Sequence, residues 1–225
     1  MKRSILTACT AVAALIAAAP GASAQRIQSH AVSARDVPRE AAYEGKLELA
    51  RRWTDRLGEN LLLLTRTNEF PSRGCEEYQD PCSDREIYGY HYVRRGGAYT
   101  LLWQTTDFER DCDFDLVLQY RPEGVAITDL DADGIAESTY VYMHTCTSDV
   151  SPNGMKLIMH EGAEKYAIRG SADISDGIGE EYGRGSMAVD PAFNRAPAAF
   201  REFAVRHWRR FERQASWAAD YNDRR

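Results

Sequence analysis

The sequence has no excess of positive charge. Its 28 lysines and arginines stand against 34 aspartates and glutamates, which gives a formal net charge of −6. Nucleic acids are bound first through lysine and arginine contacts to phosphate groups, so this balance argues against a nucleic-acid partner. After the first 24 residues there is also no apolar run of the roughly eighteen residues that a membrane span needs. We therefore expect no transmembrane segment.

Motifs of common enzyme classes are missing as well. Ser186 stands in GRGSM, which is not the G-x-S-x-G turn of serine hydrolases. The run GIGEEYGRG has the wrong glycine spacing for a dinucleotide loop and carries acidic residues where a phosphate would lie. His91, His144 and His160 fall in predicted strands without a second pair of zinc ligands. The sequence thus identifies no catalytic residue.

The first 24 residues predict export. Lys2 and Arg3 precede an apolar stretch, and Ala22-Ser23-Ala24 matches an A-x-A cleavage signature. These are the parts of a secretory signal peptide, here cleaved after Ala24. We expect a periplasmic or secreted bacterial protein.

Four cysteines remain after such cleavage, an even number that favours disulfides in an exported protein. Cys75 and Cys82 bracket a short proline-containing segment, so we expect them to pair. Cys112 and Cys146 then lie at the start and the end of two predicted antiparallel strands, which favours the second pair. Three connectivities remain formally possible.

The remaining chain predicts a single β-rich domain over 38–225, after a flexible mature N-terminus at 25–37. We expect a short helix near 38–45 and a hairpin over 48–66, although the apolar spacing there also fits a helix. Further hairpins are expected to turn at Gly96-Gly97 and at Glu161-Gly162.

The C-terminal part has helical periodicity. A helix is predicted over 191–219, with one apolar face formed by Ala196, Phe200, Phe203, His207, Phe211 and Ala215. The predicted fold class is α+β, mainly an antiparallel β-sheet with this long C-terminal helix packed on it.

One acidic loop stands out, in VAITDLDADGIAESTYVY at residues 125 to 142. Closely spaced carboxylates repel one another unless a cation, a proton or solvent relieves them. Aspartates at positions 1, 3 and 5, a glycine at 6 and a backbone carbonyl at 7 are typical of calcium loops. The spacing predicts Ca²⁺ bound by Asp129, Asp131, Asp133, the Ile135 carbonyl and Glu137. The alternative is a solvated acidic turn without metal.

The loop departs from the EF-hand, because Tyr140 takes the place of the glutamate at position 12. Over nine residues it resembles the D-x-D-x-D-G-x-x-D/E loops between strands of FG-GAP and integrin-propeller repeats. That resemblance implies a calcium ion that braces the loop.

Two further charged patterns leave alternatives open. An acidic run at 107–115 places five carboxylates on one face if it is extended, and it predicts a cation site, a carbohydrate-facing groove or a polar sheet face; its members are Asp107, Glu109, Asp111, Asp113 and Asp115. A basic stripe on the predicted helix indicates a solvated or internally paired face, or a docking strip for an anionic envelope polymer or lipid headgroup; its members are Arg206, Arg209, Arg210 and Arg213.

Three segments together resemble a family of exported bacterial proteins, some of which carry the automatic label of surface polysaccharide biosynthesis protein. They are GCEEYQDPCSDREIYGYHY, ITDLDADGIAE and CTSDVSPNGMKLIMHEGAEKYAIRG. The resemblance spans roughly residues 40 to 212 and implies export, without established catalytic residues.

These observations predict an exported, calcium-stabilised binding or cell-envelope-associated protein that is not an enzyme, with envelope polysaccharide as its candidate partner. The alternative is a hydrolase of envelope glycans that uses the carboxylates of the 107–115 face. An aromatic groove around Tyr88, Tyr90 and Tyr92 would favour binding. Two inward carboxylates about 5 to 9.5 Å apart would favour the hydrolase.

Overall fold

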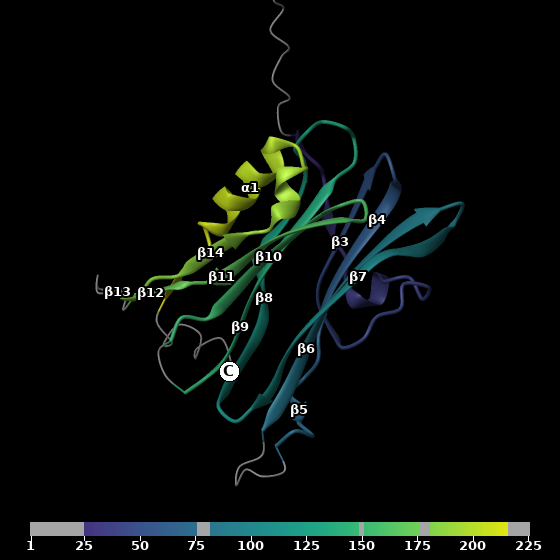
Figure 1. Ribbon diagram of the computed structural model, residues 1–225. Helices are drawn as coiled ribbons and strands as arrows, with labels where there is room; N and C mark the ends of the chain where they lie inside the picture. The colour runs from purple at the N-terminus through teal and green to yellow at the C-terminus, as the bar shows by residue number, and fades with distance from the viewer. Residues whose placement is uncertain (1–24, 76–81, 149–150, 176–180, 216–225) are drawn as a thin grey trace, which may run out of the picture.

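The protein is built from two antiparallel β-sheets that pack face to face (Figure 1). The computed structural model describes residues 25–75, 82–148, 151–175 and 181–215, so the signal peptide expected over 1–24 lies outside the described residues. The strands are β1 Gln25–Arg26, β2 His30–Ala31, β3 Lys46–Asp55, β4 Gly58–Arg66, β5 Phe70–Pro71, β6 Ser83–Arg95, β7 Ala98–Cys112, β8 Asp115–Asp129, β9 Glu137–Thr147, β10 Gly154–Glu161, β11 Glu164–Ser171, β12 Asp173–Ser175, β13 Glu181–Gly183, β14 Ser186–Val189 and β15 Arg213–Ala215. The helices are the 3₁₀ turns η1 Ala34–Asp36 and η2 Pro191–Asn194 and the α-helix α1 Ala198–Trp208.

Sheet A has the strand order β1-β8-β9-β10-β11-β14, and sheet B has the order β2-β3-β4-β6-β5, with β7 also paired to β6. The short strands β13, β12 and β15 form a small third sheet in that order. The three predicted hairpins are present as β3–β4, β6–β7 and β10–β11. Gly96, Gly97 and Gly162 have positive φ angles at two of their turns, a conformation that glycine adopts without steric cost.

The central strands β4, β9 and β10 are buried on both faces, because each sheet has the other sheet on one face and a covering segment on the other. Between the sheets lies an apolar core that joins Trp53, Leu62 and Trp103 of sheet B to Leu118 and Tyr140 of sheet A. The outer face of sheet B is covered by residues 32–44, called here the N-terminal segment. The outer face of sheet A is covered by η2 and α1. This arrangement explains the uninterrupted run Leu61 to Leu64, whose members are all fully buried on alternating faces.

The predicted long C-terminal helix is wrong, and with it the α+β class. The described residues contain one α-helix, the 11-residue Ala198–Trp208, and are otherwise mostly antiparallel β-structure. Pro197 has no amide hydrogen and disfavours a helical residue before it, so η2 and α1 remain separate. After Trp208 the chain turns, and β15 then pairs in parallel with β12. Phe211 stays buried although it lies beyond the helix.

The segment 25–37, expected to be flexible, contributes a strand to each sheet. β1 pairs with β8 of sheet A, and β2 pairs with β3 of sheet B. Val32 and Val37 pack on the outer face of sheet B. Over 38–45, where a short helix was predicted, the chain forms turns and irregular structure instead.

Two disulfides join the cysteine pairs that the sequence favoured. Cys75 and Cys82 have a Cα–Cα separation of 6.0 Å. Cys112 and Cys146 have a Cα–Cα separation of 5.6 Å and connect the end of β7 in sheet B to β9 in sheet A. The second disulfide therefore holds the two sheets together.

Candidate functional site

The acidic loop connects β8 to β9 at one end of sheet A. The last paired residues are Thr128 and Glu137, and the chain between them turns with positive φ angles at Ala132 and Gly134. Three hydrogen bonds within the loop fix its bend. The Gly134 amide donates to Asp129 Oδ2 at 3.2 Å, the Asp133 amide to Asp131 Oδ1 at 3.2 Å, and the Ile135 amide to Asp133 Oδ1 at 2.7 Å.

The four predicted carboxylates of the loop fall into two groups that could hold a metal ion. Asp129, Asp131 and Glu137 each offer an oxygen within 4.8 Å of the others. Asp131, Asp133 and Glu161 form a second group by the same measure, so Asp131 is common to both. The chemistry of both groups is all oxygen, without histidine or cysteine.

Burial makes this arrangement costly without a counter-charge. Glu137 is fully buried, and burial raises its pKa to about 8. Thr128 Oγ1 and the Leu130 amide donate to its carboxylate at 2.8 and 3.0 Å and offset part of this cost. Asp129 is only 5% exposed, and its Oδ1 is buried without a hydrogen-bond partner among the described residues. An unsatisfied buried carboxylate oxygen is an unfavourable feature that a proton or a cation would relieve.

Glu161 is the residue that sequence reasoning missed. It ends β10, directly opposite Glu137 on β9. Burial, together with the nearby charges of Asp131, Asp133 and Asp129, raises its pKa to about 7. A signal for it was available, because antiparallel pairing of the runs STYVYMHT and MKLIMHE can place residues 137 and 161 opposite each other.

The tip of the β3–β4 hairpin braces the loop from sheet B. Asp55 Oδ2 accepts a hydrogen bond from the Ala136 amide at 3.0 Å, and the Arg56 amide donates to the Gly134 carbonyl at 2.8 Å. The Arg56 side chain also forms an ion pair with Asp133 at 3.0 Å. The position of the loop therefore depends on contacts between the two sheets.

The acidic run at 107–115 does not form a single face, because β7 ends at Cys112 and Asp111 has a φ of 52°. Asp107 accepts hydrogen bonds at 2.5 Å from both Tyr142 and Lys156, and Glu109 contacts His144 at 2.7 Å.

Asp111 instead contacts Ser72, next to the Cys75–Cys82 disulfide. Asp113 and Asp115 are exposed around the turn from β7 to β8.

The hydrogen bonds of Asp107 with Tyr142 and Lys156 do not suit the general acid of a glycoside hydrolase. Burial acts to raise the pKa of Asp107, but the hydrogen bonds from Lys156 and Tyr142 outweigh it and lower the pKa below its ordinary value. A general acid needs a raised pKa in order to hold its proton near neutral pH.

The tyrosines of β6 do not line an open groove. Tyr88, Tyr90 and Tyr92 are 6%, 3% and 6% exposed and lie beneath the N-terminal segment. The Glu44 amide donates to the Tyr90 hydroxyl at 3.1 Å, and the Tyr92 hydroxyl donates to the Ala42 carbonyl. The stacked rings are part of the core.

In the described parts of the chain, no helix is long and apolar enough to cross a membrane. The two disulfides are compatible with an extracellular or periplasmic location. Comparison of the sequence with protein-family models and curated proteins, and of the structure with solved structures, found no match.

Proposed function

We propose that this is an exported bacterial protein, stabilised by calcium at its acidic loop, that acts by binding in association with the cell envelope. The observation that carries the metal is that Asp129, Asp131 and Glu137 each place an oxygen within 4.8 Å of the others, while Asp129 Oδ1 is buried without a hydrogen-bond partner among the described residues. Mutual repulsion and burial both penalise these carboxylates, and a divalent ion would offset both.

The donor set favours calcium over other metals. Calcium takes six to eight oxygens in flexible geometry, whereas zinc in proteins is bound mostly by cysteine and histidine. Asp129, Asp131, Asp133 and Glu137 would supply side-chain oxygens, and Ile135 its carbonyl. We add Glu161 to this set because its carboxylate lies within 4.8 Å of those of Asp131 and Asp133. Its Oε1 is also buried without a partner among the described residues.

The role of the ion would be structural. Its ligands come from the ends of β8, β9 and β10, and the loop is itself held by the β3–β4 hairpin of sheet B. An ion at this point would hold the ends of β8, β9 and β10 together and would keep the loop in position against the β3–β4 hairpin of sheet B. Extracellular modules typically bind calcium with dissociation constants of roughly 0.1 to 1 mM, so a modest site would be occupied outside the cell.

A thermal melt with excess calcium and with chelator tests the metal. At a hundredfold excess over its dissociation constant a ligand stabilises by about 2.7 kcal/mol, which corresponds to a Tm shift of roughly 5 to 10 °C for a chain of this size. Asp131→Ala should lose the shift, and Asp115→Ala, which removes an exposed carboxylate outside the loop, should keep it. A chelator-insensitive melting curve of the wild type would reject the metal.

The envelope association is supported by the two disulfides and by the predicted signal peptide. A glycan array of bacterial surface polysaccharides tests the candidate partner. Binding of the protein to an arrayed polysaccharide, if the same polysaccharide in solution competes for it, would support the proposal. An array without signal would remove polysaccharide as the partner. The lowered pKa of Asp107 gives no support to the hydrolase alternative.

A further inference from the structure

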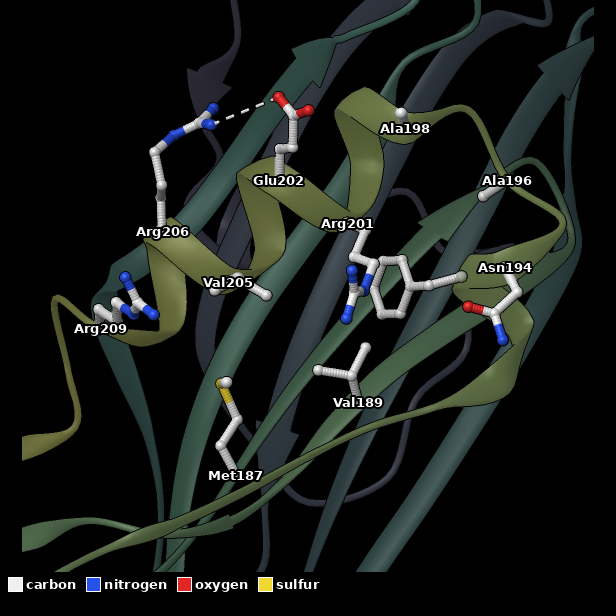
Figure 2. Close-up of a pocket in the computed structure, with 11 residues that line it drawn as sticks. Met187, Val189, Asn194, Ala196, Ala198, Arg201, Glu202, Val205, Arg206 and Arg209 are labelled. Atoms are coloured by element: carbon white, nitrogen blue, oxygen red, sulfur yellow. Dashed lines mark ion pairs between the residues drawn. The ribbon is translucent and has the colours of Figure 1, made fainter.

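A hollow of about 650 Å³ lies on the outer side of sheet A, between helix α1 and strand β14 (Figure 2). This volume is within the range of roughly 300 to 1,000 Å³ that is typical of small-molecule sites. No residue of the acidic loop lines it. Its lining residues are Met187, Val189, Phe193, Asn194, Ala196, Ala198, Arg201, Glu202, Val205, Arg206 and Arg209.

The floor of the hollow is apolar. Met187 is 41% exposed, one of the few large apolar side chains that the described chain leaves open to this degree. Val189 on β14 and Val205 on α1 extend the apolar surface, and Figure 2 shows both between the strand and the helix. Phe193 is only 2% exposed, so its ring offers no open face on which a sugar could stack.

The charges at the hollow are mostly positive, although the protein as a whole is acidic. Among the described residues, Arg201 and Arg209 have no ion-pair partner. Figure 2 shows Arg201 pointing from the helix toward Val189, whereas Arg206 and Glu202 project from the other side. The carboxylate of Glu202 lies 3.9 Å from the guanidinium of Arg206 and so does not neutralise Arg201.

The predicted basic stripe on a long helix is therefore replaced by a different arrangement. Arg209 and Arg210 follow the end of α1, and Arg213 lies in β15. The arginine that points into the hollow, Arg201, was not part of the stripe.

We propose that this hollow binds a single-chain anionic amphiphile with a carboxylate head group, in the manner of a fatty acid. Arg201 holds the carboxylate, since a guanidinium offers two parallel donors to two oxygens. The alkyl chain lies on Met187, Val189 and Val205 and removes their apolar surface from water. A free inorganic anion would leave that surface bare, and a neutral sugar would leave Arg201 unpaired. The inference goes beyond the binding function proposed above, because a fatty-acid-like ligand is a different class from the candidate polysaccharide, and it does not require the metal.

Titration of the purified protein with dodecanoate, below its micelle concentration and followed by calorimetry, tests the proposal. We expect saturable binding of one dodecanoate. Dodecan-1-ol has the same chain without the charge, and acetate has the charge without the chain. Both should bind at least tenfold more weakly.

Matched variants locate the site. Arg201→Gln should weaken dodecanoate binding about tenfold or more, because it removes a charge-assisted pair. Met187→Glu should weaken it as well, by placing a negative charge on the apolar floor. Arg195→Gln removes the same charge from an exposed residue outside the hollow and should bind as the wild type does.

Absence of dodecanoate binding, equal binding of dodecan-1-ol, or wild-type affinity in Arg201→Gln would each overturn the proposal. A chelator-insensitive melting curve would reject the calcium site and leave this binding unchanged. The two proposals therefore fail by different measurements.

Discussion

Glu137 and Glu161 lie directly opposite each other on the neighbouring strands β9 and β10. Like charges in such a cross-strand pair destabilise a sheet. Burial is the main cause of the raised pKa values of both, about 8 for Glu137 and about 7 for Glu161. Without a cation the pair is expected to hold protons at neutral pH, and a bound cation would replace those protons.

Glu161→Gln should therefore have opposite effects without and with calcium. In chelator it removes a half-buried carboxyl group that must either take up a proton or carry an unpaired charge at neutral pH, so it should raise the free energy of unfolding by up to about 1 kcal/mol. In calcium it removes a proposed ligand, so the calcium-induced rise in Tm should shrink. Melting curves in chelator and over a calcium titration measure both effects.

Glu164→Gln is the control, since Glu164 is an exposed residue across the turn from Glu161. It should change neither quantity appreciably. A calcium response in Glu161→Gln equal to that of the wild type would remove Glu161 from the ligand set.

Asp55 holds the hairpin tip and the acidic loop together. Its carboxylate accepts hydrogen bonds from Trp53 Nε1 at 3.1 Å, the Leu57 amide at 2.7 Å and the Ala136 amide at 3.0 Å. Asp55→Ala leaves three donors without this acceptor and should destabilise the protein by roughly 2 to 4 kcal/mol. Urea denaturation measures this change, with Asp113→Ala as an exposed control that should cost less than about 0.5 kcal/mol. A loss of stability no larger than that of the control would show that water satisfies the three donors when the Asp55 carboxylate is absent.

The parts of this fold that follow from local chemistry could be predicted from the sequence. Gly96-Gly97 and Glu161-Gly162 mark hairpin turns because glycine accepts positive φ angles there. The spacing of Asp129, Asp131 and Asp133 likewise predicts a bent loop, since each carboxylate accepts an amide hydrogen bond from the same loop. Such features depend on a few consecutive residues.

The rest depends on partners that are distant in the sequence. The apolar period from Phe203 to Phe211 suggests one long helix. Phe211 instead lies in a turn after the helix, where its side chain is still buried, and the chain then forms β15, which pairs with β12. The alternation of Tyr88 and Tyr90 indicates a strand face, but not that the N-terminal segment covers it. The contribution of Glu161 becomes visible only when the register of β9 and β10 is known.

The two disulfides should differ in their effect on stability. Cys112–Cys146 closes a sequence separation of 34 residues, and Cys75–Cys82 closes one of 7. Since a disulfide restricts the unfolded chain more when it closes a longer loop, we expect losses of about 4 and about 2 kcal/mol on replacing each pair by serine. Urea denaturation of the two double variants measures the difference. A larger loss for the shorter loop would indicate that native contacts around Cys75, rather than chain entropy, determine its contribution.

His91 should make the stability of the protein depend on pH. It is 1% exposed between the sheets, next to Trp53 and Trp103, and its Nε2 lies 2.9 Å from Asn60 Oδ1. Burial lowers its pKa from 6.5 to about 4, although the charge of Asp55 acts in the other direction. Between pH 6.5 and pH 4 the unfolded chain therefore binds more protons than the folded chain. The stabilisation is complete above pH 6.5 and is lost as the pH falls toward 4.

At roughly 1.4 kcal/mol for each pKa unit, this loss amounts to about 3 kcal/mol for His91. His160 is also buried, and its pKa is lowered to about 3, so it should add a loss in the same direction. The raised pKa values of Glu137 and Glu161 act in the opposite direction in the absence of calcium, so the comparison is made with calcium present. His91→Gln can retain the hydrogen bond to Asn60 but cannot titrate in this range, so the free energy of unfolding should fall less between pH 7.5 and pH 4.5 than in the wild type. His30→Gln, at an exposed histidine on β2, should leave the wild-type dependence unchanged. Urea denaturation across this pH range measures the dependence. If the free energy of unfolding changed with pH equally in His91→Gln and the wild type, protonation of His91 would not destabilise the folded protein.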